Sequence, residues 1–156
     1  MRRVVTGEGP DGRSHVVSDG PATTAEVGEM DLDLLWRNDS APLLPTATDV
    51  SPEVAFPVAG GVWVITWTIA AGATGEDPED IVQSTGERPG FHSTESVDVN
   101  LVLSGEVVLE LDEGEVVLRA GDLGVVNGSR HAWQNRSSEP VRVLSTIVGG
   151  TRTPTT

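Results

Sequence analysis

The stretch FHSTESVDVNLVLSG, residues 91–105, places polar and apolar side chains at alternating positions. The polar positions are His92, Thr94, Ser96, Asp98 and Asn100. The apolar positions are Val97, Val99, Leu101 and Leu103. Because side chains along a β-strand point alternately to the two faces of a sheet, this pattern predicts a strand with one polar and one apolar face. The alternation alone leaves two interpretations open, in which the polar face either meets solvent or lines a pocket.

Two histidines and one carboxylate are the candidates for chemistry. His92 and Asp98 lie in this stretch, and His131 follows in RHAWQN. Imidazole titrates near neutral pH, so two histidines in a pocket can act as acid and base. The same three side chains can instead hold a divalent metal, because imidazole and carboxylate ligands suit iron, manganese, nickel or zinc. A third interpretation gives both histidines structural hydrogen bonds only. His15 matches no such pattern and is expected to be structural or on the surface.

Composition limits the partners and the compartment. The chain has 156 residues, which fits one domain with its own core. Its formal net charge of −14 repels phosphate backbones and anionic lipid, so no nucleic acid or membrane partner is expected. The absence of cysteine excludes disulfides and thiolate chemistry. Since we find neither a signal-peptide pattern nor an apolar run approaching ~20 residues, we expect a cytoplasmic protein.

Strand signals dominate the rest of the chain. An N-terminal hairpin is predicted over residues 2–19, around the turn-rich EGPDGRS. Further strands are expected within residues 31–37, 61–70, 97–105, 106–122, 123–129, 130–135 and 141–149. The segment 76–84 is the one candidate for a short helix, residues 37–61 and 71–90 are predicted to be long loops, and 151–156 a flexible tail. Many short strands, with a turn about every eight to twelve residues, predict an all-β sandwich or barrel.

The segment from Gly86 to Asn135 resembles the cupin superfamily. The first cupin motif is matched in order by Gly86, His92, Thr94, Asp98 and Gly105. Thr94 stands where the motif has a second histidine, and Asp98 stands where it has a glutamate. The second motif is matched by Gly121, Gly128, His131 and Asn135, although its proline is missing and the spacing of its two glycines is one residue short.

The resemblance implies an all-β, cupin-type jelly-roll β-barrel (a double-stranded β-helix) with an N-terminal hairpin. One cupin domain would span residues 1–150, with its core over 61–148. Motif side chains of cupins point into the barrel, so the polar face of residues 91–105 should line a pocket. The apolar face must then be covered by another part of the protein or by a partner. The resemblance to cupins implies that a second copy of the chain covers it, in a homodimer. Cupin metal sites use three histidines and a carboxylate, so Thr94 and the shorter Asp98 count against a bound metal.

Tryptophans supply most of the expected pocket wall. Trp63 and Trp67 share one face of a predicted strand, and Trp133 shares a face with His131. Indole walls suit a largely apolar small molecule, although core packing is an equal interpretation for the first two. The side chains expected to bind substrate by hydrogen bonds or contact are Thr94, Asn100, Trp133, Asn135, Trp63 and Trp67.

Three functions are compatible with these residues. The first is a small single-domain cupin enzyme, similar to those of secondary metabolism and polyketide tailoring, that cyclises, isomerises or dehydrates an apolar metabolite. Its catalytic residues would be His92, His131 and Asp98, with no cofactor or with one divalent transition metal, and shape-driven cyclisation by proximity is a related possibility. The second is an oxygenase whose metal is held by the same three residues. The third is a non-enzymatic small-molecule-binding domain.

Overall fold

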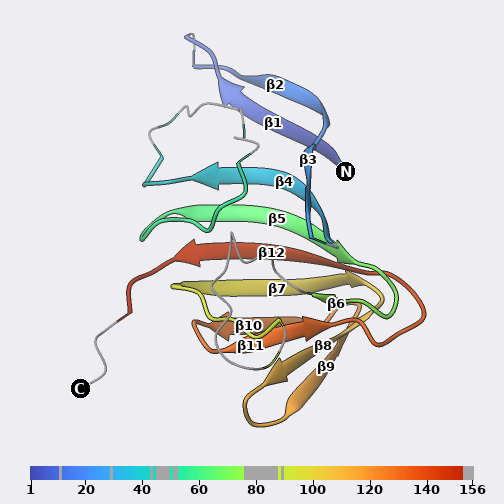
Figure 1. Cartoon of the computed structure of the whole chain (residues 1–156). Coiled ribbons are helices and arrows are strands. Elements are labelled where there is room, and N and C mark those ends of the chain that lie inside the picture. Colours follow the sequence, from blue (N-terminus) through green and yellow to red (C-terminus); the bar gives the residue numbers. More distant parts are fainter. Residues whose placement is uncertain are drawn as a thin grey trace.

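The computed structural model describes residues 1–10, 12–28, 30–42, 44, 50, 53–75, 88 and 90–152 (Figure 1). These residues form strands and no α-helix, and none of them belongs to a helix able to cross a membrane. The all-β prediction is confirmed, while the predicted short helix at 76–84 lies outside the described residues. The strands are β1 (Arg2–Glu8), β2 (Ser14–Pro21), β3 (Thr23–Val27), β4 (Met30–Asn38), β5 (Val62–Ile69), β6 (Thr74–Gly75), β7 (Ser96–Ser104), β8 (Glu106–Leu111), β9 (Glu115–Arg119), β10 (Leu123–Asn127), β11 (His131–Gln134) and β12 (Val141–Gly149).

Two antiparallel sheets enclose the interior. The larger has the order β10-β7-β12-β5-β4-β3, and the smaller has the order β6-β11-β8-β9. β1 and β2 form a separate hairpin, as predicted, which lies beside β3 and β4 at the end of the molecule opposite β8 and β9 (Figure 1). Arg3 attaches this hairpin to the larger sheet, because its guanidinium donates to the Leu35 carbonyl and stacks on the Trp36 ring at 5.7 Å.

The alternation within β7 settles which face points inward. Ser96, Asp98 and Asn100 are buried, whereas Val97 and Leu103 are 38% and 39% exposed. The polar face of this strand therefore lies inside the barrel and the apolar face outside, which is the reverse of an ordinary amphipathic strand.

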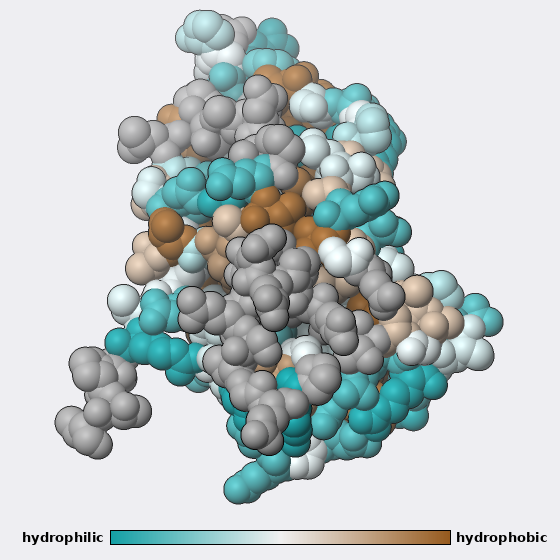
Figure 2. Space-filling view, viewed as in Figure 1, coloured by the Kyte–Doolittle hydropathy of each residue, from teal (hydrophilic) through white to brown (hydrophobic). Residues whose placement is uncertain are grey.

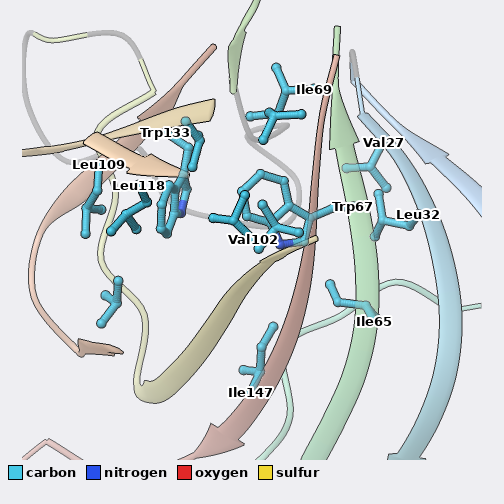
Figure 3. Packing of buried hydrophobic residues seen from close by; sticks show 14 of the residues in the cluster. Val27, Leu32, Ile65, Trp67, Ile69, Val102, Leu109, Leu118, Trp133 and Ile147 are labelled. Atoms are coloured by element: carbon cyan, nitrogen blue, oxygen red, sulfur yellow. The ribbon is translucent and has the colours of Figure 1, made fainter. Parts of the chain in front are cut away.

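The core is built from the inward side chains of both sheets (Figure 3). Cross-strand register sets these side chains in rows: Trp67 of β5 lies opposite Val143 of β12 and Leu32 of β4. From the smaller sheet, Leu109 and Trp133 face this layer. Burial of these apolar side chains holds the two sheets together.

Two glycines of the expected motifs have a backbone reason to be glycine. Gly105, between β7 and β8, has φ of 77°, and Gly121, before β10, has φ of 94°. These left-handed conformations are strained for residues with a side chain. At Gly105 a Cβ would also lie 2.7 Å from the Pro140 carbonyl oxygen.

Charged side chains cover the outside of β8 and β9. Arg119 pairs with Glu106 at 2.9 Å, and Arg136 pairs with Glu115 at 2.9 Å. Figure 2 shows the corresponding hydrophilic surface at this end of the molecule. These pairs are exposed, so they contribute little to stability and keep this end solvated.

Candidate functional site

His92 and His131 face each other where the two sheets meet. His92 precedes β7, His131 begins β11, and their backbones form an isolated antiparallel bridge with reciprocal N–H···O distances of 2.9 Å. The two imidazole ring centroids are 4.4 Å apart. Both side chains are buried, with 5% and 1% of their surface exposed. The predicted pair is therefore brought together inside the barrel.

The two imidazoles are held in the same way. Nδ1 of His92 lies 3.0 Å from the Gly90 carbonyl oxygen, and Nδ1 of His131 lies 3.0 Å from the Ser129 carbonyl oxygen. Because a carbonyl oxygen only accepts, each neutral imidazole carries its proton on Nδ1 and keeps Nε2 as the acceptor nitrogen. Backbone carbonyls thus fix both tautomers and both ring orientations.

Asp98 lies at the end of a chain of buried hydroxyl groups. The Ser96 hydroxyl donates to Oδ1 of Asp98 at 2.6 Å, and the Thr94 hydroxyl lies 2.7 Å from the Ser96 hydroxyl. Thr94 is buried but does not line the cavity described below. Its hydroxyl contacts Ser96, and its predicted contact with substrate stays a prediction.

A cavity that is open to solvent lies between the sheets. The side chains lining it are Val27, Met30, Leu32, Val54, Phe56, Trp63, Ile65, Trp67, His92, Asp98, Asn100, His131, Trp133, Ser145 and Ile147. Polar groups come from β7, β11 and β12, whereas β4, β5 and residues 53–58 supply an apolar wall. Seven of the nine predicted site residues line this cavity, the exceptions being Thr94 and Asn135.

Aromatic contacts connect the histidines to the apolar wall. The Trp133 ring lies 5.8 Å from the His131 ring, edge to face, and 5.4 Å from the Trp67 ring. Figure 3 shows Trp67 and Trp133 pointing toward each other from the two sheets. Nε1 of Trp67 donates to the Ser145 hydroxyl at 2.6 Å, and that hydroxyl donates to Oδ1 of Asn100 at 2.5 Å. These hydrogen bonds fix the indole and the amide as rigid parts of the wall.

Asn135, a predicted contact of the substrate, is buried and makes hydrogen bonds within the protein. Its side-chain nitrogen donates to the carbonyl oxygens of Ile69, Ala70 and Glu139 at 2.8–3.1 Å. Its side-chain oxygen accepts from the backbone and the hydroxyl of Ser137. Since each polar atom of the amide is already bonded to protein, Asn135 fastens the chain after β11 to the end of β5.

The three expected metal ligands do not gather into a metal site. Across the described residues, no group of three or more His, Asp or Glu side chains is arranged to hold a metal ion. His92 and His131 come together, and Oδ1 of Asp98 accepts from Ser96. A metal held by His92, His131 and Asp98 stays a prediction.

Eight of the residues that line the cavity were not among the predicted site residues, and Ser145 and Phe56 show why. Ser145 lies on β12 between the buried Val143 and Ile147, so the alternation in VRVLSTIVG carried the signal that it points inward. Phe56 belongs to residues 53–58, which form no strand. No periodic pattern marks that segment, and only the fold brings it to the cavity.

Comparison with known proteins gives a family match and several relatives. A family model described as a cupin domain matches residues 81–147. Phomopsin biosynthesis cluster protein C' of Diaporthe leptostromiformis is 37% identical over 81 residues, covering 40% of this chain and 43% of that protein. Oryzines biosynthesis cluster protein J of Aspergillus oryzae is 40% identical over 53 residues, covering 33% and 30%. The chain thus spans less than half the length of these curated relatives.

A solved structure extends the likeness to nearly the whole chain. The cupin domain of Schizosaccharomyces pombe Cnp3 matches with a TM-score of 0.55 and 12% identity, covering 95% of this chain and 87% of that chain. At this identity the likeness concerns the fold alone. It confirms the predicted cupin-type jelly-roll barrel.

Proposed function

Because this chain carries a cupin domain and resembles proteins of fungal biosynthesis clusters, we propose that it is an enzyme of secondary metabolism that moves protons on a largely apolar metabolite. The reaction class is isomerisation, dehydration or cyclisation. The observation that carries the proposal is the histidine pair, with rings 4.4 Å apart and each Nδ1 held by a backbone carbonyl oxygen, in a cavity with an apolar wall.

The histidines would divide the roles of base and acid. Nε2 of one neutral imidazole takes a proton from a carbon next to an electron-withdrawing group, and the C–H electron pair forms a new π bond as a neighbouring C=C π bond or C–O bond breaks. The other histidine acts as an imidazolium, with protons on both ring nitrogens, and its Nε2 gives a proton to the atom that receives the electrons of the broken bond. If that atom is the far carbon of the C=C bond, the double bond shifts and the substrate isomerises; if it is a hydroxyl oxygen, water leaves. The first histidine then releases its proton to solvent and the second takes one up, which restores the pair for the next turnover. Such proton transfers contribute about 10²–10⁴-fold to rate.

The remaining polar and aromatic groups would support this transfer. Asp98 lines the same cavity, and its carboxylate would favour the imidazolium form during turnover. Trp67 and Trp133 exclude water from the apolar part of the substrate. In a cyclisation, the same wall would also fold a linear substrate so that its reacting atoms meet.

An isotope experiment tests the reaction class. The gene is first deleted from the organism that encodes this chain, and a cell extract is prepared from the deletion strain. The purified chain, treated with chelator, is then incubated with this extract in D₂O. We expect a new product, read by mass spectrometry and NMR, that has gained deuterium at a carbon position if the substrate isomerises or has lost one water if it dehydrates. An oxygenase would instead stop after chelation and would incorporate label from ¹⁸O₂, and a pure binding domain would give no product. Either result would reject proton-transfer catalysis.

We also propose that a second copy of this chain covers the outer apolar face of the larger sheet. The exposed members of this face are Val97, Leu103, Leu123, Val125 and Val148. The register sets Val125 opposite Val99 and Leu123 opposite Leu101, so the apolar side chains of β10 and β7 are contiguous. β10 is also an edge strand. Covering such a face and edge removes an aggregation hazard and supports a homodimer.

Placing one charge on this face should separate the copies. We expect the wild-type chain to sediment as a dimer at micromolar concentration and Val125→Lys to sediment as a monomer, because the interface would have to desolvate the ammonium group. Val116→Lys is the matched control, since Val116 is similarly exposed but lies on β9 of the other sheet. A wild-type monomer, or equal behaviour of the two variants, would contradict the proposed interface.

A further inference from the structure

Trp63 has a buried hydrogen-bond donor without an acceptor. The residue is 2% exposed, and its indole nitrogen has no hydrogen-bond partner in the described part of the chain. Trp67, four residues further along β5 and on the same face, donates to the Ser145 hydroxyl. Buried donors in folded proteins are almost always paired, because an unpaired one has lost its hydrogen bond to water. The Trp63 N–H therefore calls for an acceptor that is not part of the protein.

The position of Trp63 relative to the polar wall follows from strand register. Trp63 lies opposite Ile147 of β12, and Ile147 lies opposite Asp98 of β7. Trp63 and Asp98 thus occupy one row across three strands, and both line the cavity. Since neighbouring strands are about 4.8 Å apart, the backbones of these two residues are separated by roughly 10 Å. A ligand spanning the cavity can reach both residues.

The cover over Trp63 is an irregular segment. The Phe56 ring packs edge to face on the Trp63 ring, with 6.3 Å between centroids. Phe56 is only half-buried, and residues 53–58 belong to no strand. This wall lacks the β-ladder hydrogen bonds that hold the rest of the barrel, so a ligand can displace it at smaller cost than any strand.

We infer that the ligand of this cavity carries a neutral carbonyl oxygen, of a ketone, ester or amide, that accepts the Trp63 N–H. The inference rests on the proposed function and adds the substrate class. The oxygen must be an acceptor because indole nitrogen only donates. It must be uncharged because Phe56, Ile65 and Ile147 surround this end of the cavity, and a carboxylate there would be desolvated without a cation. The chain's net charge of −14 also disfavours an anion.

The test compares two probes of matched shape, the ketone 1-indanone and the hydrocarbon indane. We expect Trp63→Phe, which keeps an aromatic ring but removes the N–H, to weaken 1-indanone binding by about 5–10-fold and to change indane binding by less than about twofold. Trp36→Phe is the control, since Trp36 lies outside the cavity. In the ¹⁵N-labelled wild type, the indole N–H signal of Trp63 should move downfield with 1-indanone and not with indane.

The outcomes separate this inference from the proposed function. If both probes bind but the Trp63 signal ignores the ketone, or Trp63→Phe affects both probes equally, the carbonyl assignment is wrong while the histidine pair is untouched. If the wild-type chain binds neither probe, the cavity does not accept apolar molecules, and the inference fails together with the proposed function.

Discussion

Replacing His131 by alanine is expected to slow turnover by about 10²–10⁴-fold, the usual contribution of a positioned acid or base. KM for an apolar substrate should change little, because Trp63, Trp67 and Trp133 still form the cavity wall. The backbone bridge between His92 and His131 uses only main-chain atoms, so the substitution leaves it in place. Steady-state kinetics in the same assay as the deuterium experiment measures both constants.

Two further variants show whether the histidines act as a pair. His92→Ala should slow turnover by a similar factor. The double variant should be little slower than either single variant, because the effects of groups that act as a unit are not additive. His15→Ala is the control: His15 is exposed on β2, and its replacement should leave the rate unchanged. If both alanine variants kept most of the rate while Trp133→Ala lost it, catalysis would come from the shape of the cavity and not from proton transfer.

The inward polar face was predictable because strand geometry and motif position agreed. Alternation places His92, Asp98 and Asn100 on one side of the strand, and the resemblance to cupins predicted that this side faces the interior of the barrel. Neither signal gives the partner of a side chain. Thr94 lies on the same face, yet its hydroxyl is 2.7 Å from that of Ser96 and it does not line the cavity. Which polar groups meet substrate depends on distances between strands that a single strand does not encode.

Strand positions were also more predictable than strand order. Alternation marks β7 and β12 in the sequence, and glycines mark the end of each strand. Their pairing joins Ser145 to Asn100, and that of β5 with β12 joins Trp63 to Ile147, across long stretches of chain. Such contacts come from packing of the whole barrel, so no local pattern could predict the Trp67–Ser145–Asn100 hydrogen bonds.

The position of Asn135 provides the other large expected effect, on stability. Asn135→Asp should destabilise the chain by about 3–5 kcal/mol, because it sets a carboxylate against three carbonyl oxygens that now accept from the amide. The two side chains have nearly the same size, so no cavity contributes to the loss. Urea unfolding followed by intrinsic fluorescence measures the change.

A matched variant separates this local effect from the added charge. Asn127→Asp makes the same chemical change at an exposed position of β10, and it should alter the free energy of unfolding by less than about 0.5 kcal/mol. Folded Asn135→Asp should retain its rate per native molecule, because the amide lies outside the cavity. A stable Asn135→Asp chain with impaired turnover would instead support the substrate-binding role that the motif position of Asn135 predicted. The hydrogen bonds to Ile69, Ala70 and Glu139 would then not be what holds β11 to β5.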